Sequence, residues 1–94
     1  MYKIAICDDN KAYLEVITEK IQKYCRDYGI HTELDSYSDS DKLSQKIEDK
    51  TGYDAYVLDI EMPHISGVEL AERIRKHSEQ AYICLLYTSP SPRD

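Results

Sequence analysis

Short apolar runs alternate along the chain with longer stretches in which apolar residues recur every three or four positions. Residues 3–7, 55–59 and 81–87 form runs that are apolar on consecutive positions, and residues 30–40 alternate at Thr32, Leu34 and Ser36. Consecutive apolar positions are typical of parallel strands covered by helices on both faces, whereas alternation is typical of an edge strand. These patterns predict four strands.

The first intervening stretch has the spacing of a helix. Between Lys11 and Tyr28 the apolar residues fall on one helical face. Asn10 or Asp9 is expected to cap its start, and Gly29 is expected to end it in a left-handed turn.

Two further helices are predicted in the later stretches. One reaches Lys50 and has Ser38 or Ser40 as its N-cap, and the other begins at Ser66 or Gly67. The resulting order, in which strands and helices alternate, predicts an α/β protein with a doubly wound parallel sheet.

Composition limits the classes of function. A chain of 94 residues suits one domain, and its net charge of −6 argues against a nucleic-acid or anionic-membrane surface and suits a cation site. No run is long enough to span a membrane.

The three cysteines are an odd number without CxxC spacing, and Cys7 and Cys84 lie in apolar runs. We expect both to be buried thiols of a reduced, cytoplasmic protein.

Three acidic residues follow or close the predicted strands. Asp8 and Asp9 come directly after the first strand, and Asp59 closes the third. The carboxyl ends of parallel strands meet at the sheet edge where ligands bind, so these carboxylates are expected to converge. Their repulsion is relieved by protonation or by a cation such as Mg²⁺. Asp59 is thus a candidate nucleophile toward phosphorus, with Asp8 and Asp9 holding the metal.

Two segments carry a family resemblance that covers residues 3–86. "ICDDN" and "VLDIEMPHISGVELAERIR" resemble the receiver domain of two-component response regulators. The resemblance implies a flavodoxin-like sheet of strand order 2-1-3-4. It also implies that Asp8 and Asp9 bind Mg²⁺ with the backbone carbonyl of Glu61, and that a sensor histidine kinase phosphorylates Asp59. Thr88, or alternatively Ser89, is the implied phosphate contact.

The resemblance also implies a role in signalling. The motifs are most similar to regulators whose output is a LytTR-type DNA-binding domain, so the receiver itself is expected to act as a cytoplasmic switch. It is not expected to be an enzyme or to contact nucleic acid or membrane directly. Residues 1–87 are expected to form a partial receiver that lacks the fifth strand and last helix, followed by a disordered non-family tail at 88–94. Without the fifth-strand lysine, phosphorylation is expected to be slow.

Two other functions fit parts of the pattern. A phosphorylation-independent interaction module would keep the fold and lose the chemistry. A Mg²⁺-dependent phosphatase of the haloacid-dehalogenase type would also use an aspartate nucleophile, but that class has aspartate two positions later, where this chain has Glu61.

Overall fold

The computed structural model describes residues 1–49 and 52–87. Its seven elements alternate between strand and helix, as the sequence predicts: β1 (Tyr2–Cys7), α1 (Lys11–Asp27), β2 (Thr32–Tyr37), α2 (Ser40–Glu48), β3 (Ala55–Asp59), α3 (Gly67–His77) and β4 (Tyr82–Leu86). Within these residues the strands form one parallel sheet in the order β2-β1-β3-β4. The predicted doubly wound topology and strand order are therefore confirmed.

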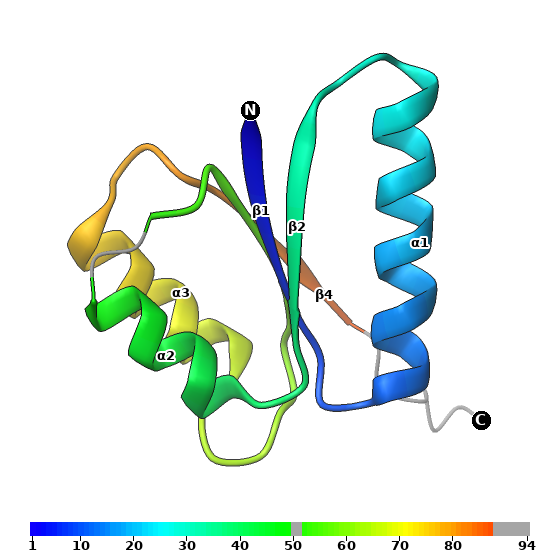
Figure 1. The fold of residues 1–94 in the computed structure, drawn as a ribbon. Coiled ribbons are helices and arrows are strands. Elements are labelled where there is room, and N and C mark those ends of the chain that lie inside the picture. The colour runs from blue at the N-terminus through cyan, green and yellow to red at the C-terminus, as the bar shows by residue number, and fades with distance from the viewer. Residues whose placement is uncertain (50–51, 88–94) are drawn as a thin grey trace.

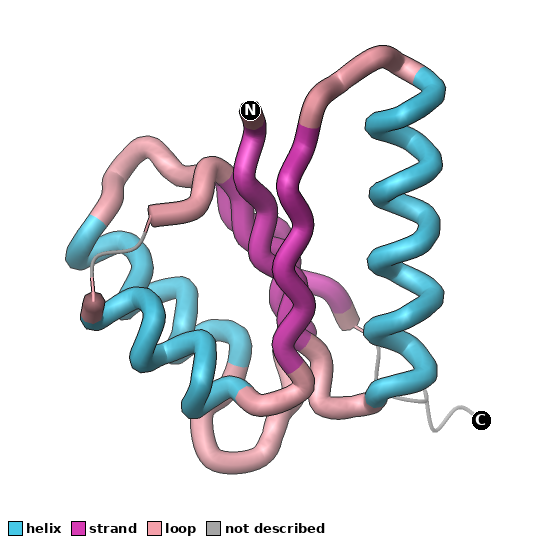
Figure 2. The backbone as a smooth tube through the Cα atoms, in the orientation of Figure 1, coloured by secondary structure: helices cyan, strands magenta, loops and turns pink. Residues whose placement is uncertain are grey.

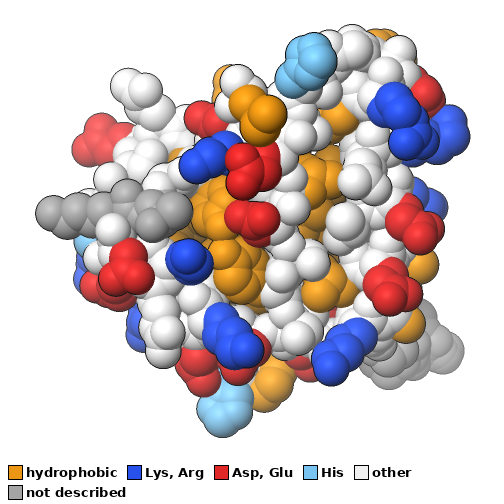
Figure 3. All heavy atoms as spheres, in the orientation of Figure 1, with side chains coloured by type: hydrophobic (Ala, Val, Ile, Leu, Met, Phe, Trp, Pro, Cys, Tyr) orange, Lys and Arg blue, Asp and Glu red, His pale blue; other side chains and the backbone are white. Residues whose placement is uncertain are grey.

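The sheet lies between two helical layers (Figure 1). Helix α1 covers one face, and α2 and α3 cover the other. Hydrophobic side chains fill both interfaces and appear as two bands on either side of β2 in Figure 3. The α1 side of the core is built from Ile4, Ile6, Leu14 and Cys25. The opposite side is larger and includes Leu43, Ile47, Leu58, Leu70 and Ile74.

Helix α1 begins and ends at residues suited to those positions. The Asn10 side chain accepts hydrogen bonds from the backbone N–H groups of Ala12 and Tyr13, which satisfies two donors that have no partner within the helix. Gly29 follows the helix with a φ of 68°, the left-handed conformation that glycine adopts most readily. Of the two predicted caps, the structure uses Asn10.

The start of α2 differs from the prediction. Asp39, rather than Ser38 or Ser40, is the N-cap, and its carboxylate accepts the Asp41 N–H at 2.9 Å. Asp39 has the extended backbone typical of a cap, whereas Ser40 is the first helical residue and is buried. In α3, Ser66 is the cap and accepts the Glu69 N–H at 3.1 Å.

The burial predicted for Cys84 is wrong, although Cys7 is buried as expected. Strand β4 lies at the edge of the described sheet, and Cys84 pairs with Val57, which faces the α1 layer. Helix α1 packs mainly against β1 and β2, so it leaves this part of the sheet face open. Cys84 is therefore exposed even though its strand is apolar. No helix in the described ranges has the length and apolar character needed to cross a bilayer.

Candidate functional site

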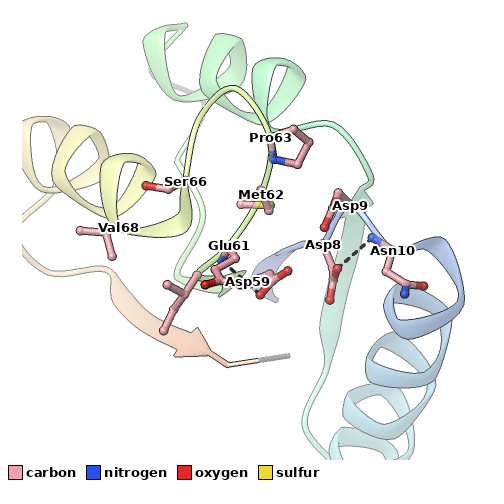
Figure 4. A pocket seen from close by; sticks show the side chains of 10 residues that line it. Asp8, Asp9, Asn10, Asp59, Glu61, Met62, Pro63, Ser66 and Val68 are labelled. Atoms are coloured by element: carbon pink, nitrogen blue, oxygen red, sulfur yellow. Dashed lines mark hydrogen bonds between the residues drawn. The ribbon is translucent and has the colours of Figure 1, made fainter. Parts of the chain in front are cut away.

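The loops that follow β1, β2 and β3 gather at the carboxyl edge of the sheet (Figure 2). The loops after β1 and β3, with the start of α3, border a hollow of about 630 Å³. Its lining combines acidic, amide and apolar groups from three segments of the chain (Figure 4): Asp8, Asp9, Asn10, Asp59, Ile60, Glu61, Met62, Pro63, Ser66 and Val68. This edge is where ligands bind in open α/β sheets.

Three carboxylates converge in this hollow. Asp59 points from the end of β3 toward Asp8 and Asp9 at the end of β1 (Figure 4). One oxygen of each residue lies within 4.8 Å of the others. Asp8 is 1% exposed and Asp59 is 4% exposed, while Asp9 is exposed. Burying carboxylates side by side is costly unless a proton or a cation balances them, so the arrangement suits a cation.

Asp8 is held by the turn that leads into α1. Its Oδ1 accepts the Asn10 N–H at 2.9 Å, and its own N–H donates to the Tyr37 carbonyl at 3.0 Å. The first bond turns the chain from strand into helix, and the second fixes the end of β1 against β2. Asp8 is thus positioned by two neighbouring elements.

Asp59 is held by the close approach of the β3–α3 loop. The Glu61 N–H donates to Asp59 Oδ1 at 3.4 Å, and the Gly67 N–H donates to the Ile60 carbonyl at 2.9 Å. A Cβ at position 67 would overlap the backbone carbonyl of Asp59. Only glycine therefore allows α3 to begin this close to the backbone at the end of β3.

The electrostatic environment of the hollow is negative. Burial, and after it the negative charges of Asp8, Asp39, Asp59 and Asp9, together raise the pKa of the Cys7 thiol to about 12. A negative potential opposes formation of a thiolate and attracts a cation. The donors are carboxylate oxygens, the ligands that Mg²⁺ prefers, so the residues present fit this ion.

The predicted convergence of Asp8, Asp9 and Asp59 is confirmed by the structure. Asp39, in the β2–α2 loop, also adds to the negative potential near Cys7. The sequence gives no signal for this contribution, because only the fold brings the β2–α2 loop close to the end of β1. Thr88 and Ser89, the predicted phosphate contacts, lie outside the described residues, as does the predicted tail 88–94.

Comparisons with known proteins agree with this geometry. The family model of the response regulator receiver domain matches residues 4–92. This match runs past residue 87, so the domain boundary expected there stays a prediction. Among solved structures, a BeF3-activated DrrB receiver domain has a TM-score of 0.72 and 25% identity, over 90% of this chain and 64% of that one. A complex of histidine kinase ThkA with response regulator TrrA gives a TM-score of 0.75 and 33% identity, over 100% of this chain and 75% of the matched chain.

Two curated proteins are also similar in sequence. The transcriptional regulatory protein NatR of Bacillus subtilis (strain 168) is 36% identical over 78 residues. Hybrid signal transduction histidine kinase L of Dictyostelium discoideum is 28% identical over 80 residues. The chain spans only 31% and 4% of the lengths of these relatives. Because the family model covers nearly the whole sequence, the chain belongs to the response regulator receiver domain family.

Proposed function

We propose that Asp59 is the phosphoacceptor of this receiver domain. The observation that carries the proposal is the convergence of Asp59 with Asp8 and Asp9 at the carboxyl edge of the sheet. In this assignment Asp8, Asp9 and Asp59 hold Mg²⁺ through carboxylate oxygens, and the backbone carbonyl of Glu61 completes the protein ligands. The Glu61 carbonyl is assigned from the family resemblance.

The proposed reaction is a direct phosphoryl transfer. A carboxylate oxygen of Asp59 forms a bond to phosphorus while the bond from phosphorus to the leaving group breaks. With a phosphohistidine donor, the broken bond is P–N and the imidazole leaves. The Glu61 N–H, bonded to Asp59 Oδ1, orients the attacking carboxylate. Bound Mg²⁺ would neutralise the charge of the incoming phosphoryl group.

The proposal includes a signalling partner and an output. A sensor histidine kinase is the proposed donor, supported by the similarity to a response regulator solved in complex with a histidine kinase. A DNA-binding output of the LytTR type is proposed from the family resemblance, and a role in transcription is supported by the similarity to a transcriptional regulatory protein. The domain would act in the cytoplasm as a switch that assists its own phosphorylation, rather than as a metabolic enzyme.

Phosphorylation by a small donor tests this function. We expect the intact mass of the chain to increase by one phosphoryl group with acetyl phosphate and Mg²⁺, and not when a chelator removes the metal. Asp9→Asn should weaken Mg²⁺ binding in a titration of the folded protein, because it removes a charged oxygen ligand. A folded chain that binds Mg²⁺ without gaining a phosphoryl group would instead support the interaction module. Hydrolysis of a phosphomonoester would support the phosphatase.

A further inference from the structure

The β3–α3 loop contains a tight turn next to the acidic site. The Ile65 N–H donates to the Pro63 carbonyl at 2.8 Å, and His64 between them has a φ of 70°. A hydrogen bond across three residues with a positive central φ defines the rarer and strained form of the γ-turn. A non-glycine residue keeps this conformation only where its surroundings hold it.

Ser40 contacts the carbonyl that closes this turn. Its Oγ donates to the Pro63 carbonyl oxygen at 3.3 Å. A carbonyl oxygen has two lone pairs, so it can accept from Ser40 and from Ile65 at the same time. Ser40 is 4% exposed and lies at the start of α2, where a hydroxyl without a partner would be costly to bury. Figure 4 shows Pro63 where the loop passes the first turn of α2.

Met62, the loop residue before Pro63, is held by a contact with β1. The Cys7 thiol, at the end of β1, lies 3.6 Å from the Met62 sulfur and donates a weak hydrogen bond to it. Met62 and Pro63 are thus fixed by β1 and by α2. Both directly follow Glu61, whose N–H is bonded to Asp59 Oδ1. These two contacts therefore hold the part of the loop that directly follows Glu61.

We propose that Ser40 is a positioning residue for the acidic site. Its buried hydroxyl holds the 63–65 turn against α2 and so fixes the Glu61 backbone beside Asp59. Ser40 itself does not line the hollow that contains the carboxylates, so it acts through the loop. The effect on metal binding rests on the proposed function of Asp8, Asp9 and Asp59, whereas the effect on the turn does not.

The chain offers a matched control on the same helix. Ser44 is one turn after Ser40, is also buried at 6% exposed, and accepts one hydrogen bond from Arg73 Nη1 at 2.7 Å. Ser40→Ala and Ser44→Ala each remove one buried hydroxyl from α2. Only the first removes a contact to the β3–α3 loop.

Two measurements on both variants test the proposal. In the metal-free protein, hydrogen exchange of the Ile65 amide should become about two- to tenfold faster in Ser40→Ala and stay unchanged in Ser44→Ala, as the loss of one hydrogen bond implies. In a Mg²⁺ titration, the Kd should rise by about two- to tenfold in Ser40→Ala alone. Ser40→Thr keeps the hydroxyl and should restore both values.

The outcomes separate this inference from the proposed function. Equal changes of the Ile65 exchange rate in Ser40→Ala and Ser44→Ala would overturn the role of Ser40. An unchanged Ile65 exchange rate in Ser40→Ala would overturn it as well. A wild-type chain that binds no Mg²⁺ would overturn the metal assignment, while Ile65 exchange would still decide the role of Ser40. If Ser40→Ala does not fold, Ser40→Cys retains the shape with a weaker donor and gives the same comparison.

Discussion

Gly67 shows how a single residue sets the geometry of the site. A side chain at this position would overlap the backbone carbonyl of Asp59, the residue whose carboxylate faces Asp8 and Asp9. Because the atom it would meet belongs to the backbone, no rotamer change relieves the overlap. The start of α3 and the end of β3 must move apart to admit even a methyl group.

Gly67→Ala should therefore destabilise the protein by about 2–3 kcal/mol, as overpacking of a close contact does. Urea unfolding of the variant and the wild type measures the difference. Gly52→Ala is the matched control, because a Cβ at Gly52 meets no atom within 4 Å. It should change the free energy of unfolding by less than about 0.5 kcal/mol. Equal effects of the two substitutions would contradict the close approach at Gly67.

At the scale of elements, hydrogen bonds between side chains attach the edge strand β2 to the segment before β3. The Tyr53 hydroxyl donates to Asp35 Oδ2 at 2.7 Å and lies 2.7 Å from the Tyr37 hydroxyl. Because a carboxylate only accepts, the Tyr53 proton faces Asp35 and the Tyr37 hydroxyl donates to Tyr53. Two residues of β2 are thus bound to one buried tyrosine.

Tyr53→Phe should lower the free energy of unfolding by about 1–3 kcal/mol, because it leaves a partly buried carboxylate without this donor. Tyr24→Phe, on the exposed side of α1, should change the free energy of unfolding by less than about 0.5 kcal/mol.

Burial, followed by the bonds to Tyr37 and Asp35, raises the pKa of Tyr53 above its ordinary value of 10.0. The stability that the Tyr53 hydroxyl contributes is complete below pH 10. It falls as the pH rises further, because Tyr53 then loses its hydroxyl proton more readily in the unfolded chain than in the folded one.

The pH dependence gives a second readout of the same prediction. The difference in stability between wild type and Tyr53→Phe should narrow above pH 10, since the variant lacks the group that titrates. Urea unfolding at neutral and alkaline pH measures this. A difference that stays constant or widens would contradict the assignment of the proton to Tyr53.

The helices and strands were predicted from the sequence more accurately than the caps and the contacts between elements. The bounds 55–59 of β3 were predicted correctly because a run that is apolar on both faces ends abruptly in Asp59. The carboxylates converged as expected because the carboxyl ends of adjacent parallel strands meet at one edge. The N-cap of α2 was not predicted, since Asp39 is selected over its serine neighbours by its backbone conformation. The contact of Ser40 with Pro63 has no local signal, because it joins residues that only the packing of α2 brings together.

At the scale of the whole molecule, the two edges of the described sheet differ. Strand β2 carries Glu33 and Asp35, charges of the kind that discourage pairing with another chain. Strand β4 contains no charge, and Tyr82 and Leu85 are 72% and 39% exposed. Apolar edge strands without charged side chains are typical sites of association with another chain.

We therefore expect the 94-residue chain to associate as its concentration rises, which sedimentation velocity measures. Cys84→Lys places a charge on the exposed face of β4 and should shift the distribution toward monomer. A wild-type chain that stays monomeric at every concentration would contradict this expectation. A substitution that leaves association unchanged would show that another surface is responsible.

The central claim is that the three carboxylates act together, with Asp59 receiving the phosphoryl group. Its most direct test is to locate the label after reaction with acetyl phosphate and Mg²⁺, by reducing the acyl phosphate with borohydride and sequencing the peptides by mass spectrometry. We predict a single modified residue, Asp59, and no modification when Mg²⁺ is removed. Modification of Asp8 or Asp9 instead, or equal labelling in Asp59→Asn, would contradict the claim.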